Sequence, residues 1–117
     1  MINGIGSPLS ALLALQKKNE SIANNVANVD TDGYKKTRVT LVEGAVEGVT
    51  TNVSRVETER PLVHEQTTEG ETLVEKSNVD IGEELPRQML TKRFFQANIK
   101  AIQTADDMLG SLINIKS

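Results

Sequence analysis

Apolar residues recur at helical spacing near the N-terminal end of the chain, over residues 9–29. Ser7 and Pro8 precede them, and a capping hydroxyl followed by proline is a strong helix start. The a and d positions of a heptad hold Leu9, Leu12, Gln16, Asn19, Ala23 and Val26. Three further residues widen the stripe on one side: Leu15, Ile22 and Val29. The pattern predicts an amphipathic helix roughly 30 Å long, at ~1.5 Å per residue.

We expect this first helix to end near Val29, because residues 30–33 read Asp-Thr-Asp-Gly. Aspartate and glycine favour turns, and Gly33 tolerates the left-handed backbone that commonly follows a helix.

A second, longer helical pattern occupies residues 81–115 near the other end of the chain. One row keeps 3–4 spacing throughout: Ile81, Leu85, Gln88, Lys92, Phe95, Ile99, Ile102, Asp106, Leu109 and Ile113. A second face holds Ala97, Ala101, Ala105 and Leu112. Ser77–Asp80 reads as a variant of a capping box before the helix. Two usable faces indicate contact with more than one neighbour.

Pro86 interrupts the second pattern. Proline inside a helix removes one backbone hydrogen bond and costs about 3 kcal/mol. We therefore expect a kink at this position, or a fresh helix start at residues 84–86.

The segment between the two helices has a different character. Residues 41–76 contain eight glutamates, three basic residues and no aromatic residue. Arg38–Val42 and Val49–Val56 are rich in valine and threonine, so they are predicted to be strands. Glycines separate these runs, and we expect a small hairpin or meander.

Together these patterns predict a mainly α fold with a small β insertion. The terminal helices should pair as an antiparallel, coiled-coil-like hairpin. Residues 1–36 form the first half of this helical domain, 37–76 the acidic β region and 77–117 the second half. Only three of the 117 residues are aromatic, so a thin core between paired helices is favoured over a thick globular one.

Charge and composition exclude several classes of function. The net charge of −3 gives no sign of nucleic-acid binding. The chain has no cysteine, which excludes disulfides, thiolate catalysis and cysteine-bound zinc. Residues 1–14 lack the charged start and long apolar core of a secretory signal peptide, and no apolar run approaches the roughly 20 residues that span a bilayer. We therefore expect no membrane insertion, and any export must use a route that cleaves no signal.

Candidate sites for chemistry are weak. Residues 28–33 match the first half of a calcium loop, but Val39 stands where that loop needs its closing glutamate, and Lys35 and Lys36 would repel the ion. His64 is the only histidine, and a solvated loop position is its favoured reading. We predict no catalytic, cofactor-binding or metal site.

The asparagines in the second half of the first helix carry more information. They are Asn19, Asn24, Asn25 and Asn28. Asparagine is a mediocre helix former, because its side chain competes for backbone groups. Asparagine at a buried helix seam fixes register at some cost in stability. Because these residues alternate with alanine and valine, we favour a seam or subunit contact over a fraying surface.

The residues at both ends resemble one known family. Residues 22–36, IANNVANVDTDGYKK, are similar to the N-terminal signature of the bacterial flagellar rod and hook proteins. SNVDI at 77–81, FQAN at 95–98, IQTADDMLG at 102–110 and LINI at 112–115 resemble the C-terminal helix of that family. The short middle makes the chain close in size to a proximal rod protein.

The resemblance implies a structural subunit of the flagellar axial structure. In that family the terminal helices pair into an inner coiled coil, and the middle forms a variable outer β domain. Subunits are exported unfolded by the flagellar type III apparatus, without a cleaved signal, into the rod that crosses the periplasm. The implied partners are further copies, other rod and hook subunits and the export apparatus.

On this interpretation the assembly interface has two parts. The apolar seam is predicted to comprise Leu12, Ile22, Val26, Phe95, Ile99, Ile102, Leu109 and Ile113. Register and the turn into the β region are assigned to Asn24, Asn25, Asn28 and Gly33. Two alternatives stand beside it: a small calcium- or ligand-responsive helix-loop regulator, and a cytoplasmic coiled-coil adaptor that mimics a rod subunit.

Overall fold

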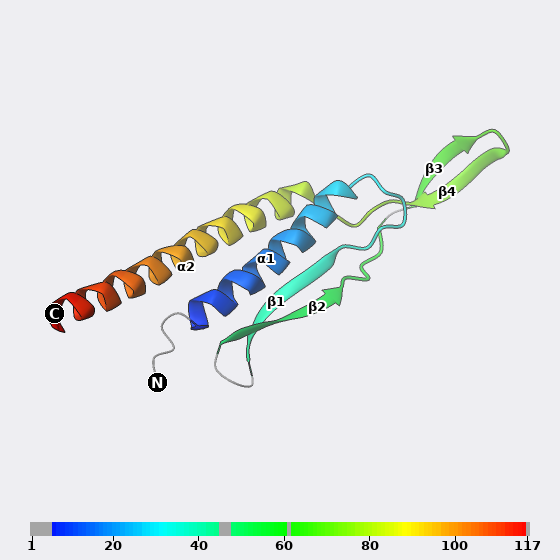
Figure 1. The fold of residues 1–117 in the computed structure, drawn as a ribbon. Coiled ribbons are helices and arrows are strands. Elements are labelled where there is room, and N and C mark those ends of the chain that lie inside the picture. Colours follow the sequence, from blue (N-terminus) through cyan, green and yellow to red (C-terminus); the bar gives the residue numbers. More distant parts are fainter. Residues whose placement is uncertain (1–5, 45–47, 61, 117) are drawn as a thin grey trace.

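The computed structural model describes residues 6–44, 48–60 and 62–116 (Figure 1). Helix α1 spans Gly6–Ala27, and helix α2 spans Ile81–Lys116. Between them lie four strands: β1 (Thr37–Glu43), β2 (Val49–Arg55), β3 (Leu62–Thr67) and β4 (Gly70–Glu75). The molecule is elongated, with principal extents of 81 × 25 × 19 Å. The predicted fold, helices at the two ends with a small β insertion between them, is confirmed.

The two helices run antiparallel and side by side, as predicted (Figure 1). Helix α1 is the middle layer, because the β1–β2 hairpin packs on its other side. The small core consists of Ala14, Leu15, Ile22, Val39 and Val79. None of these side chains is aromatic, which agrees with the thin core expected from composition.

The buried face of α1 differs from the predicted heptad row. Leu9 is 49% exposed, and Gln16, Asn19 and Ala23 also face solvent. The flanking positions are buried instead: Ala14, Leu15, Ser21, Ile22 and Asn25. The physical reason is that α1 is covered from two directions, by a helix and by a hairpin. Its buried surface is therefore centred between two contacts rather than on one helix seam.

Helix α2 is much longer than its partner. It has 36 residues against 22 in α1, or about 54 Å against about 33 Å at ~1.5 Å per residue. Its C-terminal part therefore extends beyond the start of α1 (Figure 1). The side facing α1 carries Glu84, Gln88, Thr91 and Phe95. Leu85 and Lys92, which the predicted row included, are exposed, because the true row begins at Glu84 rather than at Leu85.

Pro86 lies inside α2, in its second turn. The expected fresh start at residues 84–86 is wrong, since the helix already begins at Ile81. Asp80 caps it: its carboxylate accepts from the Gly82 N–H at 2.9 Å, and its carbonyl accepts from the Glu84 N–H at 3.0 Å. The cap is therefore Asp80 alone, because the Ser77 hydroxyl accepts from the Val79 N–H instead. Because Pro86 has no backbone N–H, α2 lacks the one hydrogen bond that residue 86 would donate to the Gly82 carbonyl in the first turn.

The β region consists of two separate antiparallel hairpins rather than one meander. In the first, Thr37 pairs with Arg55 and Glu43 with Val49, which confirms the two predicted strands within a residue at each end. The second hairpin, β3–β4, was not predicted as separate strands. It places His64 opposite Leu73, so the histidine lies in an exposed strand and not in a loop. Figure 1 shows this hairpin projecting from the end of the molecule where α2 begins.

Candidate functional site

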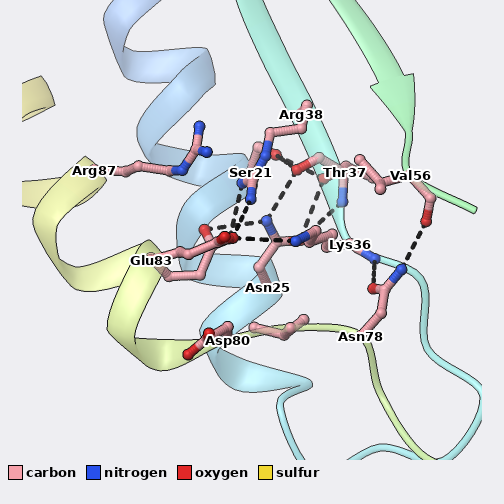
Figure 2. A network of polar contacts seen from close by, with 12 residues as sticks. Ser21, Asn25, Lys36, Thr37, Arg38, Val56, Asn78, Asp80, Glu83 and Arg87 are labelled. Atoms are coloured by element: carbon pink, nitrogen blue, oxygen red, sulfur yellow. Dashed lines mark hydrogen bonds and ion pairs between the residues drawn. The ribbon is translucent and has the colours of Figure 1, made fainter. Parts of the chain in front are cut away.

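A buried polar cluster joins the two terminal segments, with Asn25 at its centre (Figure 2). The Asn25 side-chain nitrogen donates to the Thr37 carbonyl at 2.9 Å and to the Glu84 carboxylate at 3.3 Å. Its side-chain oxygen accepts from the Thr37 N–H at 3.0 Å and from the Tyr34 hydroxyl at 3.1 Å. This fully buried side chain thus ties α1 to the first residue of β1 and to the first turn of α2.

Glu84 brings a buried charge to the same cluster. Its carboxylate is fully buried and accepts from the Arg38 guanidinium at 2.8 Å. A buried carboxylate is tolerated only when it is paired and hydrogen-bonded, and Arg38 and Asn25 meet both conditions. The ion pair therefore fixes the start of α2 against β1.

Glu83 forms the solvent-facing part of this junction. Its carboxylate accepts from Lys36 at 3.2 Å and from Arg38 at 3.3 Å. The hydrogen bond from Lys36 is the main cause that lowers the pKa of Glu83, and the charges of Lys36, Arg38 and Arg87 add to it.

Ser21 and Tyr34 complete the cluster. The Ser21 hydroxyl, one helical turn before Asn25, hydrogen-bonds the Thr37 hydroxyl at 2.6 Å. Burial raises the pKa of the Tyr34 phenol above its usual 10.0, and the negative charge of Glu84 raises it further. The phenol is thus held in the neutral form that donates to Asn25.

Asn78 makes a second junction just before α2. It is almost fully buried, and its side-chain oxygen accepts from the Lys36 N–H at 2.7 Å. Its side-chain nitrogen donates to the carbonyls of Val56 at 2.8 Å and Thr58 at 3.1 Å. The chain leaving β2 and the chain entering β1 are therefore held together by one residue that also precedes α2 (Figure 2).

The turn after α1 is tied to the end of β4. Gly33 has a φ of 72°, the left-handed conformation predicted for it, and its N–H donates to the Glu75 carbonyl at 2.8 Å. Lys35 pairs with the Glu75 carboxylate and donates to the Thr58 carbonyl at 3.1 Å. The hydrogen bond from Lys35 is the main cause that lowers the pKa of Glu75.

The predicted asparagines have different roles in the subunit. Asn25 alone is buried at the junction. Among the described residues, Asn28 makes hydrogen bonds only at the C-terminal end of α1. Its side-chain nitrogen donates to the Asn24 carbonyl at 2.8 Å, and its side-chain oxygen accepts from the Thr31 hydroxyl at 3.0 Å. The Asn24 side chain is exposed. The assembly roles given to Asn24 and Asn28 stay predictions.

The predicted apolar seam divides into an inner and an outer part. Ile22 is buried, and five members are half-buried: Leu12, Val26, Phe95, Ile102 and Leu109. Ile99 and Ile113 are 37% and 70% exposed. Glu84 lies opposite Asn25, and α1 begins 19 residues before Asn25, so the part of α2 after about residue 103 extends beyond α1. This part includes Leu109 and Ile113. The other six members thus lie along the length over which the two helices pack, whereas Leu109 and Ile113 have no partner helix among the described residues.

A groove of about 680 Å³ follows the line between the helices. Its walls are Leu15, Gln16 and Asn19 of α1 and Gln88, Met89, Thr91, Lys92 and Phe95 of α2. These side chains include no carboxylate, histidine or hydroxyl pair arranged for acid–base chemistry.

The loop that resembles half a calcium site is engaged in other contacts. Asp32 accepts from Lys76 at 2.9 Å, and the Asn28 side chain is bonded within the turn. Among residues 6–44, 48–60 and 62–116, no three acidic or histidine side chains gather closely enough to hold a metal ion. Within the same residues, neither helix is long and apolar enough to cross a membrane.

Two family models match the chain, one at each end. Residues 8–35 match the model described as "Flagella basal body rod protein". Residues 72–115 match the model described as "Flagellar basal body rod FlgEFG protein C-terminal". Together they cover more than half of the chain, and both describe flagellar rod proteins. The chain belongs to the flagellar basal body rod protein family.

Curated relatives agree over a limited stretch. The chain is 46% identical over 44 residues to the flagellar basal-body rod protein FlgG of Borreliella burgdorferi, covering 38% of this chain and 17% of the relative. It is 44% identical over 43 residues to the flagellar hook protein FlgE of Helicobacter pylori, covering 37% of this chain and 6% of the relative. FlgG of Bacillus subtilis is 42% identical over 43 residues, which cover 37% of this chain and 16% of the relative. The chain therefore spans less than a fifth of the length of these relatives.

The rod-family segments are the ones that meet in space. Residues 8–35 include most of α1 and the turn through Lys35, and residues 72–115 include most of β4 and α2. The Asn25–Glu84 hydrogen bond connects the two segments directly. Strands β1, β2 and β3 fall between the matched segments.

Sequence reasoning missed Glu84, the partner of Asn25 in α2. It also did not single out three other residues of the two junctions: Arg38, Ser21 and Asn78. One usable signal was present: Glu84, Gln88, Thr91 and Phe95 keep 3–4 spacing, which places the carboxylate on the side of α2 that faces α1.

Proposed function

We propose that this rod-family protein is a non-enzymatic structural subunit of the flagellar axial structure. It polymerises through its terminal helices with further copies and with other rod or hook subunits. The buried cluster around Asn25 and Glu84 serves this role by fixing the two helices and the first hairpin as one rigid unit.

The observation that carries the proposal is the uncovered end of α2. Beyond α1, this helix carries Met108, Leu112, Ile113 and Ile115, each at least 60% exposed. Removing apolar surface from water stabilises an assembly by roughly 25 cal/mol per Å². A helix end whose apolar row is left exposed by the described residues fits assembly with neighbouring subunits.

The predicted location and export route belong to the same proposal. A subunit of the rod crosses the inner membrane through the flagellar type III apparatus without a cleaved signal, and it resides in the periplasm-spanning rod. The absence of cysteine agrees with passage into an oxidising compartment.

Fractionation of flagellated cells tests the proposal. Purified basal bodies should contain the chain, detected by an antibody or by mass spectrometry. A chain confined to the cytoplasmic fraction would contradict the proposal and support the adaptor. Calcium titration by calorimetry tests the regulator, which requires heat of binding that is lost when Asp30 and Asp32 are replaced by Asn.

A further inference from the structure

We propose that the β3–β4 hairpin of one subunit docks on the outer face of α2 of a second copy. The hairpin face includes Leu62, Glu71 and Leu73, together with His64 and Gln66. The outer face of α2 consists of Leu90, Arg93 and Lys100, with Met89 at the edge where this face meets the groove between the helices. This inference rests on the proposed function and names the surfaces through which copies meet.

The hairpin has few contacts with the rest of the described subunit. Among the described elements, β3 and β4 contact only each other (Figure 1). The Gly33 N–H and Lys35 hold its base through Glu75, and Lys76 pairs with Glu65 midway along β3. A two-stranded hairpin is marginally stable by itself in water, so this one gains from a surface to pack on.

One face of the hairpin is both apolar and acidic. The register places Leu62, Glu71 and Leu73 on the same side, because side chains alternate along each strand and His64 pairs with Leu73. Leu62 and Leu73 are more than half exposed. Such a face fits a partner that is apolar and basic.

The charge of the whole region points the same way. Residues 57–75 contain six glutamates and one arginine. Glu69 and Glu71, at and next to the hairpin tip, belong to none of the ion pairs found in the described part of the chain. The hairpin therefore presents uncompensated negative charge.

Helix α2 has the opposite character between Arg87 and Lys100. That stretch contains four basic residues and no acidic residue. Arg93 and Lys100 are seven residues apart and so share a helix face. Thr91 and Phe95, which face α1, lie about 200° around the helix from Arg93. The face with Arg93 and Lys100 therefore points away from α1. Met89 and Leu90 beside them are 61% and 52% exposed. This outer face complements the hairpin in charge and in apolar character.

The two surfaces cannot meet within one subunit. The hairpin projects beyond the end of the molecule where α2 begins, whereas the outer face lies along the body of α2 (Figure 1). A second copy is therefore required. A contact between two different surfaces repeats from copy to copy and gives a filament when it does not close into a ring.

Cysteine pairing in assembled basal bodies tests this contact. The chain has no cysteine of its own, so introduced thiols react only at chosen positions. A variant with both Leu73→Cys and Met89→Cys should give a ladder of dimers, trimers and larger products on oxidation. Each single-cysteine variant should give no ladder, because one thiol per copy links at most two copies. A Thr50→Cys/Met89→Cys variant, with an exposed cysteine on β2, is the matched control and should also give none.

Charge reversal in the Leu73→Cys/Met89→Cys variant gives the second test. Glu71→Arg should reduce the ladder about tenfold or more, because like charges across an interface are strongly unfavourable, and adding Arg93→Glu should restore it. Glu43→Arg, at an exposed position at the end of β1, makes the same charge change away from the proposed contact and should leave the ladder intact.

The outcomes separate the two proposals. The docking contact is overturned if the Leu73→Cys/Met89→Cys chain enters basal bodies but gives no ladder. It is also overturned if Glu71→Arg abolishes the ladder and Arg93→Glu does not restore it. Either result leaves the proposed function standing. Absence of the unaltered chain from basal bodies overturns the proposed function and this inference with it.

Discussion

The Asn25 amide nitrogen lies 3.3 Å from the Glu84 carboxylate, and both side chains are completely buried although 59 residues separate them in the chain. This contact joins α1 to the first turn of α2. It lies between the two segments that match the rod-protein family. The pairing of the termini thus rests on a specific polar contact as well as on apolar packing.

Replacing Asn25 should destabilise the isolated subunit strongly. Asn25→Ala removes partners from Tyr34, Thr37 and Glu84, and each buried group left unpaired costs roughly 1–3 kcal/mol. We expect the free energy of unfolding to fall by about 2–4 kcal/mol in urea denaturation. Asn24→Ala, at the exposed neighbouring position, should change it by less than about 0.5 kcal/mol. Equal effects of the two variants would contradict the role given to Asn25.

Tyr34 should report the charge of Glu84. It is the only tyrosine in the chain, so the absorbance of its phenolate can be followed without interference. Burial and the Glu84 charge both raise its pKa, and Glu84→Gln should lower the pKa toward 10.0 while leaving it raised by burial. An unchanged titration in a folded Glu84→Gln variant would show that the two groups do not interact.

The raised tyrosine pKa also predicts alkaline unfolding. The unfolded chain releases the phenol proton near pH 10.0, while the folded chain retains it to higher pH. The contribution of Tyr34 is therefore fully present below that value and is lost as the pH rises through the folded-state pKa. Tyr34→Phe should flatten the fall in stability above pH 10, which urea denaturation at several pH values would measure.

Glu83 should contribute to stability at neutral pH but not in acid. Its pKa is lowered in the folded state, first by the hydrogen bond from Lys36. A lowered pKa means that the contribution is present above the usual value of 4.5 and is lost as the pH falls through the folded-state pKa. Glu83→Gln should therefore be less stable than the unaltered chain at pH 7 and should lose less stability on acidification. Parallel pH profiles for the two proteins would contradict this reading.

Two glycines should respond to alanine in opposite directions. Gly48 has a φ of 117°, and an added Cβ would lie 2.9 Å from the Ser10 hydroxyl oxygen, which accepts from the Val49 N–H at 3.0 Å. Gly48→Ala should therefore destabilise the docking of the first hairpin on α1. Gly110 lies within α2 with open space around it, and Gly110→Ala should stabilise the helix by about 0.5–1 kcal/mol. Thermal unfolding compares the two, and an increase in melting temperature with Gly48→Ala would contradict the close approach.

The elements that were predictable from sequence have strong local signals. The two helices have long periodic patterns and cap residues, and the first hairpin has valine- and threonine-rich runs bounded by glycine. Strands β3 and β4 lack such a signal, because their glutamates and threonines face solvent on both sides and no core imposes an alternation. The buried face of α1 was misplaced because its second covering layer, β1–β2, arises from tertiary packing that helical periodicity does not encode.

The candidate site also contains residues that the sequence predicted and residues that it did not. Asn25 was anticipated because asparagine among alanines and valines is unusual in a helix. Its partner Glu84 was not, because a glutamate in the first helical turn is ordinarily an exposed residue that interacts with the helix dipole. Only the three-dimensional position of Arg38, which neutralises the buried charge, makes that carboxylate part of the core.

Incorporation into basal bodies is the decisive measurement for the proposal that the exposed end of α2 assembles with neighbouring subunits. Ile113 is 70% exposed, so Ile113→Asp should leave the isolated subunit folded. Val53→Asp, at a half-exposed position on β2, is the matched control. We expect basal bodies to contain the Val53→Asp chain at normal levels and to lack the Ile113→Asp chain, although cells synthesise both. Normal incorporation of Ile113→Asp would contradict it.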